Sequence, residues 1–411
     1  MNPTAPRVAY FTIKYPTLSQ TFLQREVETL RAQGIEVEVY PCWQLGPQPA
    51  NESAFPSPAA PVHPLTLSQL WTLPWHGFRQ TFRLRKNWRL AGQLLRRHRP
   101  RTFEGWFMTV WGTLYALHLA GRFASNPPDH FHGAWATGPA TLAAVLARRF
   151  GKHFSFGAHA YDVYRDGGDP LLDPKLQNAA FIHTTTRQTE QHLLSRVPES
   201  HIILSRRGLP ALPDYRQPTA AHQPVRLLSV GRLVEKKGHI HQLAACAALK
   251  KAGTSVELRL VGDGPLGESL QETACELGLQ HEVIFCGAQP ASEVSQHYRW
   301  ADLFWHTGIV DSEGDRDGLP NVIPEAMAHG VPVISCQEAG ALEAIEHEVT
   351  GLTVEVRDTE TLVKRVQRLA SDLELRRRLA RSAREWVETH FSSERNTALL
   401  AEAFRQVVQK R

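Results

Sequence analysis

Acidic side chains and a glycine lie together in one loop of the sequence. Asp315 and Asp317 precede Gly318, and Glu325 follows in the next segment. Because Gly318 permits a turn and proline suits the first turn of a helix, we expect a helix to begin near residues 320–321. The first amides of that helix attract phosphate, whereas acids beside them suit hydrogen bonds from sugar hydroxyls. The pattern therefore predicts a ligand site at this loop.

Two apolar segments must position the loop. Residues 301–307 and 331–335 have the composition of short strands. In open α/β sheets, ligands bind at the carboxyl ends of the strands. We therefore expect the acidic loop at the carboxyl edge of a sheet.

A second loop, with two cations, is expected at a similar edge. Residues 225–230 are a predicted strand, and Gly231–Gly238 is the loop after it. Arg232 and Lys237 in this loop suit the neutralisation of a diphosphate. Surface charge on an ordinary loop is the alternative.

The alternation of strands and helices runs through both halves of the chain. Expected strands lie at 8–13, 35–40, 130–135, 153–160, 181–186, 201–204, 225–230, 256–261 and 283–285, and the basic run at 363–383 is expected to form one helix. Four prolines between residues 210 and 224 mark the expected domain boundary. The 411 residues are enough for two cores, so the sequence predicts an α/β protein with two Rossmann-like doubly wound domains.

The loop after the first strand is expected at the carboxyl edge of the first sheet, because a strand, helix and parallel strand follow one another there. Lys14, Ser19 and Gln20 belong to this loop and are candidates for contacts with an acceptor. Capping of the next helix is the alternative for Ser19 and Gln20.

Two histidines of the first half are candidate site residues. His132 belongs to an expected strand, and His159 is expected at the end of another strand. A histidine at a strand end can contact a substrate. The alternative for His159 is a hydrogen bond within the fold.

Composition excludes several classes of protein. The 46 basic and 41 acidic residues give a formal charge of +5, which is too balanced for a general nucleic-acid-binding surface. Five cysteines without close pairs predict neither disulfides nor a zinc site, as expected for a reducing cytoplasm. The apolar run at 8–13 is too short for a signal peptide. The uncharged run at 105–121 is near the lower limit of about 17 residues for a membrane span, and we expect a buried helix instead.

The segment 68–101 mixes tryptophan and phenylalanine with arginine and lysine, and no acid occurs between Glu52 and Glu104. Aromatic and cationic side chains together suit an anionic membrane surface, and a solvated helix face is the alternative. We expect no nucleic-acid partner, because no recognised binding motif accompanies the segment.

Two motifs are incomplete. Gly262–Gly267 has the spacing of a dinucleotide fingerprint, but it follows the second strand of its domain and contains Pro265. The acidic loop resembles a calcium loop, but it starts on Glu313 and has Pro324 where a glutamate is required.

These residues together resemble a known family. The chain is similar to family 4 retaining nucleotide-sugar glycosyltransferases of the GT-B fold. It is most similar to the bacterial exopolysaccharide, or colanic acid, subgroup with a Pro-x-x-Ser-x-Thr-Phe motif, here Pro16–Phe22. The segments that carry the resemblance are Pro16–Phe22, Gly231–Arg232, Lys237–Gly238, Val261–Pro265, Ala301–Asp302, Gly318–Pro320 and Glu325–Ala328.

The resemblance implies roles for individual residues and requires no metal. The implied donor-binding residues are Gly231, Arg232, Lys237, Gly287, Gly318, Leu319, Asn321 and Glu325. The implied catalytic residues are His159, Asp317 and Glu325, and the acceptor-side candidates are Lys14, Ser19, Gln20 and His132. The family pattern has glutamate at the position of Asp317 and often a second histidine at that of Ala134.

The resemblance also implies an organisation and a function. An acceptor domain over 1–215 and a donor domain over 216–390 are expected to face a cleft, with a final helix over 391–411 crossing back to the first domain. The expected function is transfer of a hexose from a UDP- or GDP-sugar to a glycan or lipid-linked acceptor, in the cytoplasm or at the inner face of the membrane. The alternatives are an NAD-dependent oxidoreductase and a non-catalytic membrane-binding protein.

Overall fold

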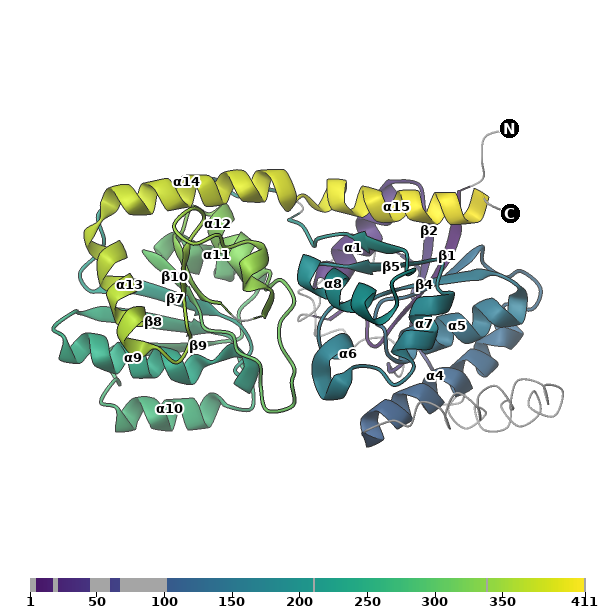
Figure 1. Cartoon of the computed structure of the whole chain (residues 1–411), viewed down its shortest axis with the longest axis horizontal. Coiled ribbons are helices and arrows are strands. Elements are labelled where there is room, and N and C mark those ends of the chain that lie inside the picture. The colour runs from purple at the N-terminus through teal and green to yellow at the C-terminus, as the bar shows by residue number, and fades with distance from the viewer. Residues whose placement is uncertain are drawn as a thin grey trace. The chain divides into compact units, whose positions relative to one another are not determined.

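The computed structural model describes residues 5–17, 21–44, 60–66, 102–209, 211–337 and 339–409. The chain divides into two compact units, each with its own sheet (Figure 1). Unit 1 is Met1–Gly208 together with Ser393–Arg411, and unit 2 is Leu209–Ser392. Both sheets are parallel, so the α/β class with two doubly wound domains is confirmed.

The sheet of unit 1 has the strand order β2-β1-β3-β4-β5-β6. Its strands are β1 (Arg7–Thr12), β2 (Glu36–Pro41), β3 (His130–Gly133), β4 (His153–Gly157), β5 (Phe181–Thr184) and β6 (Ile202–Leu204). The order reverses between β1 and β3, which makes the carboxyl ends of these strands the favoured ligand edge of the unit.

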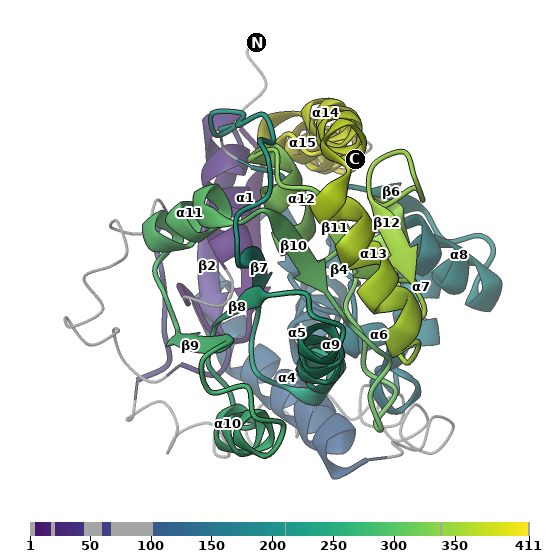
Figure 2. The same cartoon turned by 90° about the vertical axis from the view of Figure 1, so that its left-hand side faces the viewer.

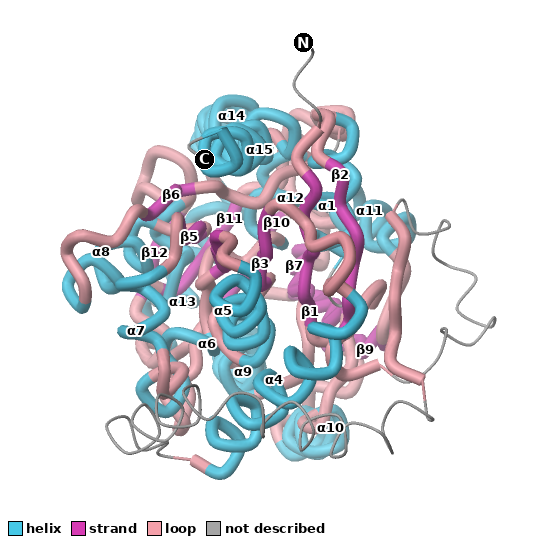
Figure 3. The backbone as a smooth tube through the Cα atoms, turned by 90° about the vertical axis from the view of Figure 1, so that its right-hand side faces the viewer, coloured by secondary structure: helices cyan, strands magenta, loops and turns pink. Residues whose placement is uncertain are grey.

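Helices cover both faces of this sheet (Figure 3). The helices of unit 1 are α1 (Thr21–Ala32), α4 (Phe103–Arg122), α5 (Gly138–Phe150), α6 (Tyr161–Tyr164), α7 (Leu172–Asn178), α8 (Arg187–Arg196) and α15 (Ser393–Gln409). One apolar cluster joins α1 and α15 to the sheet, and another joins α4 and α5 to the opposite face. Helix α15 packs against α1, and the Arg405 guanidinium of α15 donates to the main-chain oxygen of Gln33, directly after the end of α1, at 2.6 Å.

The uncharged run at 105–121 lies in α4, as expected for a helix. Thr102 caps its start by accepting from Gly105 N at 3.2 Å. Only one side of the helix is buried, and Phe103 and Trp106 at its start are exposed. Within the described parts of the chain, no helix has the length and apolar character needed to cross a membrane.

Unit 2 has the strand order β12-β11-β10-β7-β8-β9 (Figure 2). Its strands are β7 (Val225–Val230), β8 (Val256–Val261), β9 (Val283–Gly287), β10 (Leu303–His306), β11 (Val333–Cys336) and β12 (Leu352–Val354). Its helices are α9 (His239–Lys251), α10 (Gly267–Glu276), α11 (Ala291–Trp300), α12 (Val322–Ala328), α13 (Thr359–Ser371) and α14 (Leu373–His390). One face packs against α9, α10 and α13, and the other against α11, α12 and the second half of α14.

Two expectations about element boundaries are wrong. The basic run at 363–383, expected as one helix, belongs to α13 and α14, which are separated by Asp372. The Asp372 carboxylate accepts from Leu375 N at 2.9 Å and so caps the start of α14. The strand before His159 ends at Gly157, so His159 lies in the following loop.

Candidate active site

The loops after β7 and β10 start at one edge of the unit 2 sheet (Figure 2). Counted from β7 as the first strand, the order is 3-2-1-4-5-6, so it reverses between β7 and β10. Ligands of open α/β sheets bind at the carboxyl ends of strands beside such a reversal. Both expected site loops, 231–238 and 307–321, therefore meet at the favoured edge.

Ion pairs join these two loops. Lys237 Nζ donates to Asp317 Oδ2 at 2.6 Å. Lys236 Nζ lies 2.9 Å from Asp315 Oδ2 and 3.5 Å from Asp317 Oδ1. The four side chains retain only 11–15 % of their exposure, so these contacts are less screened by water than surface ion pairs. The structure thus brings the predicted Lys237 and Asp317 together.

The backbone around Lys237 allows little change. Gly238 has φ 63°, and a Cβ there would lie 2.0 Å from Thr307 O. The Thr307 hydroxyl donates to the main chain of the same turn, 3.1 Å from Lys237 O and 3.0 Å from Gly238 O. A Cβ at Gly231 would lie 3.4 Å from Lys237 Cε, so the lysine side chain passes directly over this glycine. Only glycine at position 238 lets the two loops approach this closely.

The electrostatics of the pair favour the ionised aspartate. Burial by itself raises the pKa of the Asp317 carboxyl, but Lys237, His306 and Lys236 together hold that pKa well below its usual range. His306 Nε2 lies 3.8 Å from Asp317 Oδ2, and His306 Nδ1 lies 3.2 Å from Ser335 Oγ. Burial lowers the pKa of His306 below its ordinary value. Asp317 is therefore an anion between cationic lysines at neutral pH.

The glycine-rich turn after β8 supports the cationic loop. Gly262 has φ 143°, and a Cβ there would lie 2.0 Å from Gly231 O. A Cβ at Gly264 would lie 2.5 Å from Leu233 O, and Leu233 N donates to Asp263 O at 3.0 Å. These glycines allow two backbones to stack. The near match to a dinucleotide fingerprint thus has a packing cause.

The acidic loop is held from behind by the turn at Ala339–Glu343. Gly340 N donates to Asp317 O at 3.2 Å. A Cβ at Gly340 would lie 2.4 Å from Gly318 O and 2.7 Å from Leu319 N. Leu319 itself is buried in the core of the unit. The main chain at 317–319 is therefore fixed in place.

Helix α12 begins where the sequence predicts, directly after Asn321. Asn321 Oδ1 is buried and has no hydrogen-bond partner in the described part of the chain. Glu325 in the first turn lies with Oε2 3.2 Å from the Tyr298 hydroxyl. Burial, followed by the charge of Glu325, raises the pKa of Tyr298 well above its ordinary value, so the hydroxyl stays protonated as a donor.

The remaining predicted donor residues lie around the same sheet edge. Arg232 is exposed in the loop after β7. Gly287 is exposed at the end of β9, has φ 68°, and accepts from Gly262 N through its main-chain oxygen at 2.8 Å.

In unit 1, a buried aspartate organises the loop that carries His159. Asp162 Oδ1 accepts from His159 N at 3.1 Å and from Ala160 N at 2.9 Å. Asp162 Oδ2 accepts from Ala136 N at 2.9 Å. Burial raises the pKa of Asp162 above its ordinary value. One side chain thus links the loop after β3 to the loop after β4.

The His159 ring is buried beside other aromatic rings. Trp135 meets it edge-on with ring centroids 5.2 Å apart, and His183 does so at 5.0 Å. Burial and the neighbouring His183 lower the pKa of His159 well below its ordinary value. His159 Nδ1 has no hydrogen-bond partner in the described part of the chain, so the predicted alternative of a hydrogen bond within the fold is not realised by that nitrogen.

A cavity opens beside this loop in unit 1. Its lining includes the residues Thr137, Tyr161, Glu104, Asp166 and Arg165. Lys175 Nζ supports the cavity wall by donating to Ala136 O at 2.5 Å, to Thr137 O at 3.2 Å and to Asp169 Oδ1 at 2.7 Å. Hydroxyl, acidic and basic residues lining a concave site suit a ligand with many hydroxyls.

The acceptor-side candidates lie in different environments. Lys14 is exposed after β1, and its main-chain oxygen lies 3.3 Å from the Thr12 hydroxyl. His132 is fully buried on β3. Ser19 and Gln20 lie outside the described residues, as does the basic segment 68–101.

Sequence reasoning missed several residues of these two edges. Lys236 adjoins Lys237, and His306 is the last residue of β10, so the positions of these two residues were the signals that could have found them. Asp162 follows His159 by three residues at the start of a helix, the spacing of a side chain that caps a turn. The closeness of Glu26 and His183 to His132 had no signal in the sequence.

The chain is similar to known proteins over both units. Residues 213–386 match the model of the glycosyl transferases group 1 family. The amylovoran biosynthesis glycosyltransferase AmsK of Erwinia amylovora is 28 % identical, covering 98 % of this chain and 100 % of that protein. The putative colanic acid biosynthesis glycosyltransferase WcaL of Escherichia coli is 26 % identical, over 94 % and 97 %.

A solved structure shares the fold. HepE of Anabaena, crystallised with UDP and glucose, matches with a TM-score of 0.69 at 15 % identity, covering 98 % of this chain and 100 % of that protein. The similarity includes the segment that holds Lys237, Asp317 and Glu325. Residues 213–386 thus match the glycosyl transferases group 1 model, and the chain is a glycosyltransferase that is similar along its length to relatives named for amylovoran and colanic acid synthesis.

Proposed function

We propose that the chain is a retaining hexosyltransferase. It would move a hexose from a UDP- or GDP-sugar to a hydroxyl of a glycan or lipid-linked acceptor during synthesis of a surface polysaccharide. The observation that carries the proposal is the Lys237–Asp317 pair at the strand reversal of unit 2. It places a positive and a negative group together where a sheet of this order binds ligands.

The cationic loop suits the diphosphate of the donor. Lys237 passes over Gly231, and exposed Arg232 lies in the same loop. Two phosphates leaving a sugar gain negative charge, and fixed cations stabilise that charge without reorganising. Lysine and arginine supply this charge from the protein itself, so we expect the donor site to need no metal ion.

The side-chain oxygens of unit 2 described above suit hydrogen bonds from the sugar hydroxyls of the nucleotide sugar. Glu325 is oriented by the Tyr298 hydroxyl and retains partial exposure for a ribose hydroxyl. Asn321 Oδ1, which has no protein partner among the described residues, suits the same task. Asp317 is ionised and would accept from a hydroxyl of the transferred hexose.

Retention of the anomeric configuration requires attack on the face from which the diphosphate leaves. The leaving phosphate oxygen would take the proton of the acceptor hydroxyl, the sugar–oxygen bond of the donor would break, and the new glycosidic bond would form on the same face. The protein then contributes charge stabilisation and positioning rather than a nucleophile. The cavity beside the His159 loop of unit 1 is the proposed acceptor site.

Calorimetry with the full chain tests the donor class. We expect UDP or GDP to bind and NAD not to bind. Incubation with the matching nucleotide sugars, followed by NMR of the product, should show an α-linked product from an α-linked donor. Binding of NAD alone would overturn the proposal, and an inverted product would overturn the retaining mechanism.

A further inference from the structure

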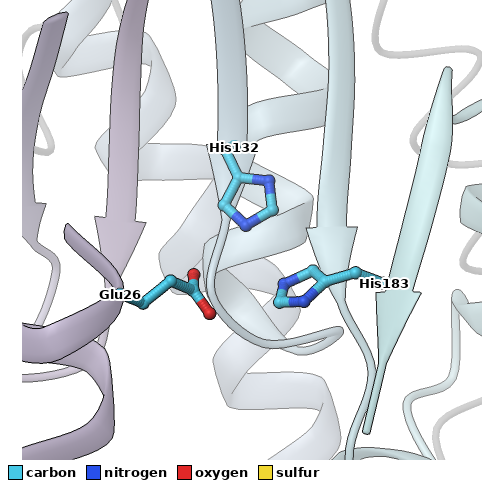
Figure 4. Close-up of side chains that lie close together, drawn as sticks. All are labelled: Glu26, His132 and His183. Atoms are coloured by element: carbon cyan, nitrogen blue, oxygen red, sulfur yellow. The ribbon is translucent and has the colours of Figure 1, made fainter. Parts of the chain in front are cut away.

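Three side chains from distant parts of the sequence converge in unit 1 (Figure 4). Glu26 comes from α1, His132 from β3 and His183 from β5. One carboxylate oxygen and one ring nitrogen from each histidine all lie within 4.8 Å of one another. Figure 4 shows the three side chains pointing toward a common centre.

The nitrogens of this cluster lack the partners that buried groups normally have. His132 is 0 % exposed and His183 is 1 % exposed. His132 Nδ1 lies 2.7 Å from Ser155 Oγ, whereas its Nε2 has no hydrogen-bond partner in the described chain. Both ring nitrogens of His183 also lack a hydrogen-bond partner in the described chain. Because buried polar atoms are nearly always satisfied, these nitrogens indicate a missing ligand.

The carboxylate is oriented for the same ligand. The Tyr10 hydroxyl donates to Glu26 Oε1 at 2.6 Å. This contact fixes the carboxyl group and leaves its second oxygen for another partner.

We propose that Glu26, His132 and His183 bind one divalent transition-metal ion of the zinc class. Two imidazoles and one carboxylate are ligands that Zn²⁺ accepts, with a water or another group in a fourth position. A point within roughly 2.8 Å of all three atoms exists when no two are more than 4.8 Å apart. Shifts of roughly 0.8 Å or less in the side chains then reach the usual ligand distances of about 2.0–2.2 Å.

The surroundings have the contacts that metal ligands commonly receive. Ser155 holds Nδ1 of His132, which directs Nε2 to the centre, and Tyr10 holds the carboxylate. The ion would attach α1 to strands β3 and β5. It would also fix the ring of His183. This ring lies beside that of His159, because a Cβ at Gly157 would be 2.7 Å from His183 Nε2 and 2.5 Å from His159 Nε2.

This proposal is independent of the proposed function. The donor residues Lys237 and Asp317 belong to unit 2, and no step of sugar transfer passes through the ion. A chain carrying Lys237→Ala is expected to bind the metal as the parent does. Failure of either idea therefore leaves the other testable.

The test uses the full chain after removal of metals with a chelator and dialysis. We expect one Zn²⁺ per chain by calorimetry and by elemental analysis after gel filtration, and a visible absorption band of four-coordinate Co²⁺ on titration with cobalt. Glu26→Gln, which keeps the shape and the Tyr10 contact, should weaken binding by more than about 100-fold. Ser155→Ala should weaken it by about 10- to 100-fold. His201→Ala, at an exposed histidine of the same unit, is the matched control and should bind normally.

The parent chain decides the question even where a variant fails to fold. No stoichiometric binding of Zn²⁺ or Co²⁺ to the parent would overturn the proposal. Unchanged affinity in folded Glu26→Gln would overturn it as well, because the ion would then bind elsewhere. An equal loss of metal affinity in Glu26→Gln and His201→Ala would also overturn the proposal.

Discussion

Lys237 Nζ lies 2.6 Å from Asp317 Oδ2, and this contact bridges the loops that follow β7 and β10. The lysine is thus oriented by a carboxylate at the sheet edge where a donor diphosphate is proposed to bind. Lys236, the residue before Lys237, has its Nζ 3.5 Å from Asp317 Oδ1. A ligand at this edge therefore meets a fixed arrangement of two lysines paired with Asp315 and Asp317.

Replacing Lys237 with alanine should lower the rate of sugar transfer by at least about tenfold. The variant loses a charge-assisted contact to phosphate, worth roughly 1.5–3 kcal/mol. Arg232→Ala should have a similar effect. Initial rates and nucleotide affinity should be measured together, with folding checked by circular dichroism.

Lys250→Ala is the matched control for these variants. Lys250 also forms an ion pair, with Glu282 at 2.7 Å, but its side chain is 48 % exposed and lies at the end of α9. Its loss should leave transfer unchanged. A well-folded Lys237→Ala chain that works as fast as the Lys250→Ala chain would place the diphosphate elsewhere.

The glycine turn after β8 gives a second prediction. Gly262→Ala should lower the free energy of unfolding by more than Gly253→Ala does. Both glycines have positive φ, which costs other residues about 1–2 kcal/mol. A Cβ at 253 meets nothing within 4 Å, whereas one at 262 meets Gly231 O at 2.0 Å. Urea unfolding of both variants would measure the difference.

The substitution Gly262→Ala should also affect nucleotide binding at the donor site. A displaced Gly231 carbonyl moves the loop that carries Lys237, so nucleotide affinity should fall in Gly262→Ala and not in Gly253→Ala. Equal stability and equal nucleotide affinity in the two variants would show that the turn after β8 can shift without displacing the loop after β7.

Much of the fold could be predicted because apolar periodicity records which residues enter a core. The strand over 225–230 and the helix start near Asn321 agree with the structure for this reason. The break at Asp372 was missed because apolar spacing continues across it, and a single capping aspartate outweighs that pattern. Residues 301–307 were predicted as a strand, yet the role of His306 depends on Asp317, eleven positions farther along the chain.

The contacts between site residues could be predicted from spacing only where those residues share a loop. Lys237 and Gly231 lie in one motif, so their proximity has a sequence signal. The pairing of Lys237 with Asp317 depends on which strands are neighbours, and sequence spacing does not contain that order. The same holds for Glu26, His132 and His183, which three different elements bring together.

Asp162→Asn should destabilise unit 1 and slow transfer. The carboxylate accepts from backbone amides on both oxygens, and an asparagine has only one acceptor oxygen. At least one buried N–H would lose its partner, at a cost of about 1–3 kcal/mol. Thermal unfolding and transfer rates would measure the two effects.

Asp372→Asn serves as the comparison for Asp162→Asn. Asp372 accepts from one amide, Leu375 N, and asparagine caps helices as well as aspartate does. This variant should keep parental stability and activity. If Asp162→Asn behaved in the same way, the link between the loops after β3 and β4 would have no part in holding His159.

Residues 68–101 lead to a prediction from composition alone. The chain should bind liposomes of anionic lipid at low salt and be released as salt increases, because the screening length falls from about 10 Å at 0.1 M to about 3 Å at 1 M. Charge reversal at Arg96, Arg97 and Arg99 should weaken binding. Neutral liposomes are the control, and a parent chain that stays unbound at low salt would contradict the prediction.

Asp317→Asn should reduce transfer by about tenfold or more, whereas Asp317→Glu should retain measurable activity. The asparagine removes an ionic acceptor for a sugar hydroxyl and the partner of Lys237. Asp315→Asn is the control, because it removes a neighbouring carboxylate that pairs with Lys236 and leaves the contact of Lys237 with Asp317 in place. If Asp317 only positions the lysine, nucleotide affinity should change together with the rate. A rate that falls with affinity retained assigns the carboxylate to the hexose.

The pH dependence of stability separates the ion pair from the role in transfer. Burial raises the pKa of Asp317, but Lys237 and its neighbours more than offset this and hold it well below 3.8. A lowered carboxyl pKa adds to the free energy of unfolding above the unfolded pKa, and this addition is lost as pH falls through the folded pKa. The difference between parent and Asp317→Asn should therefore be constant from about pH 8 to about pH 5 and shrink below about pH 4. Urea unfolding across this range is the measurement. A difference that already shrinks near pH 6 would mean that a histidine such as His306, and not the carboxylate, controls the stability of the site.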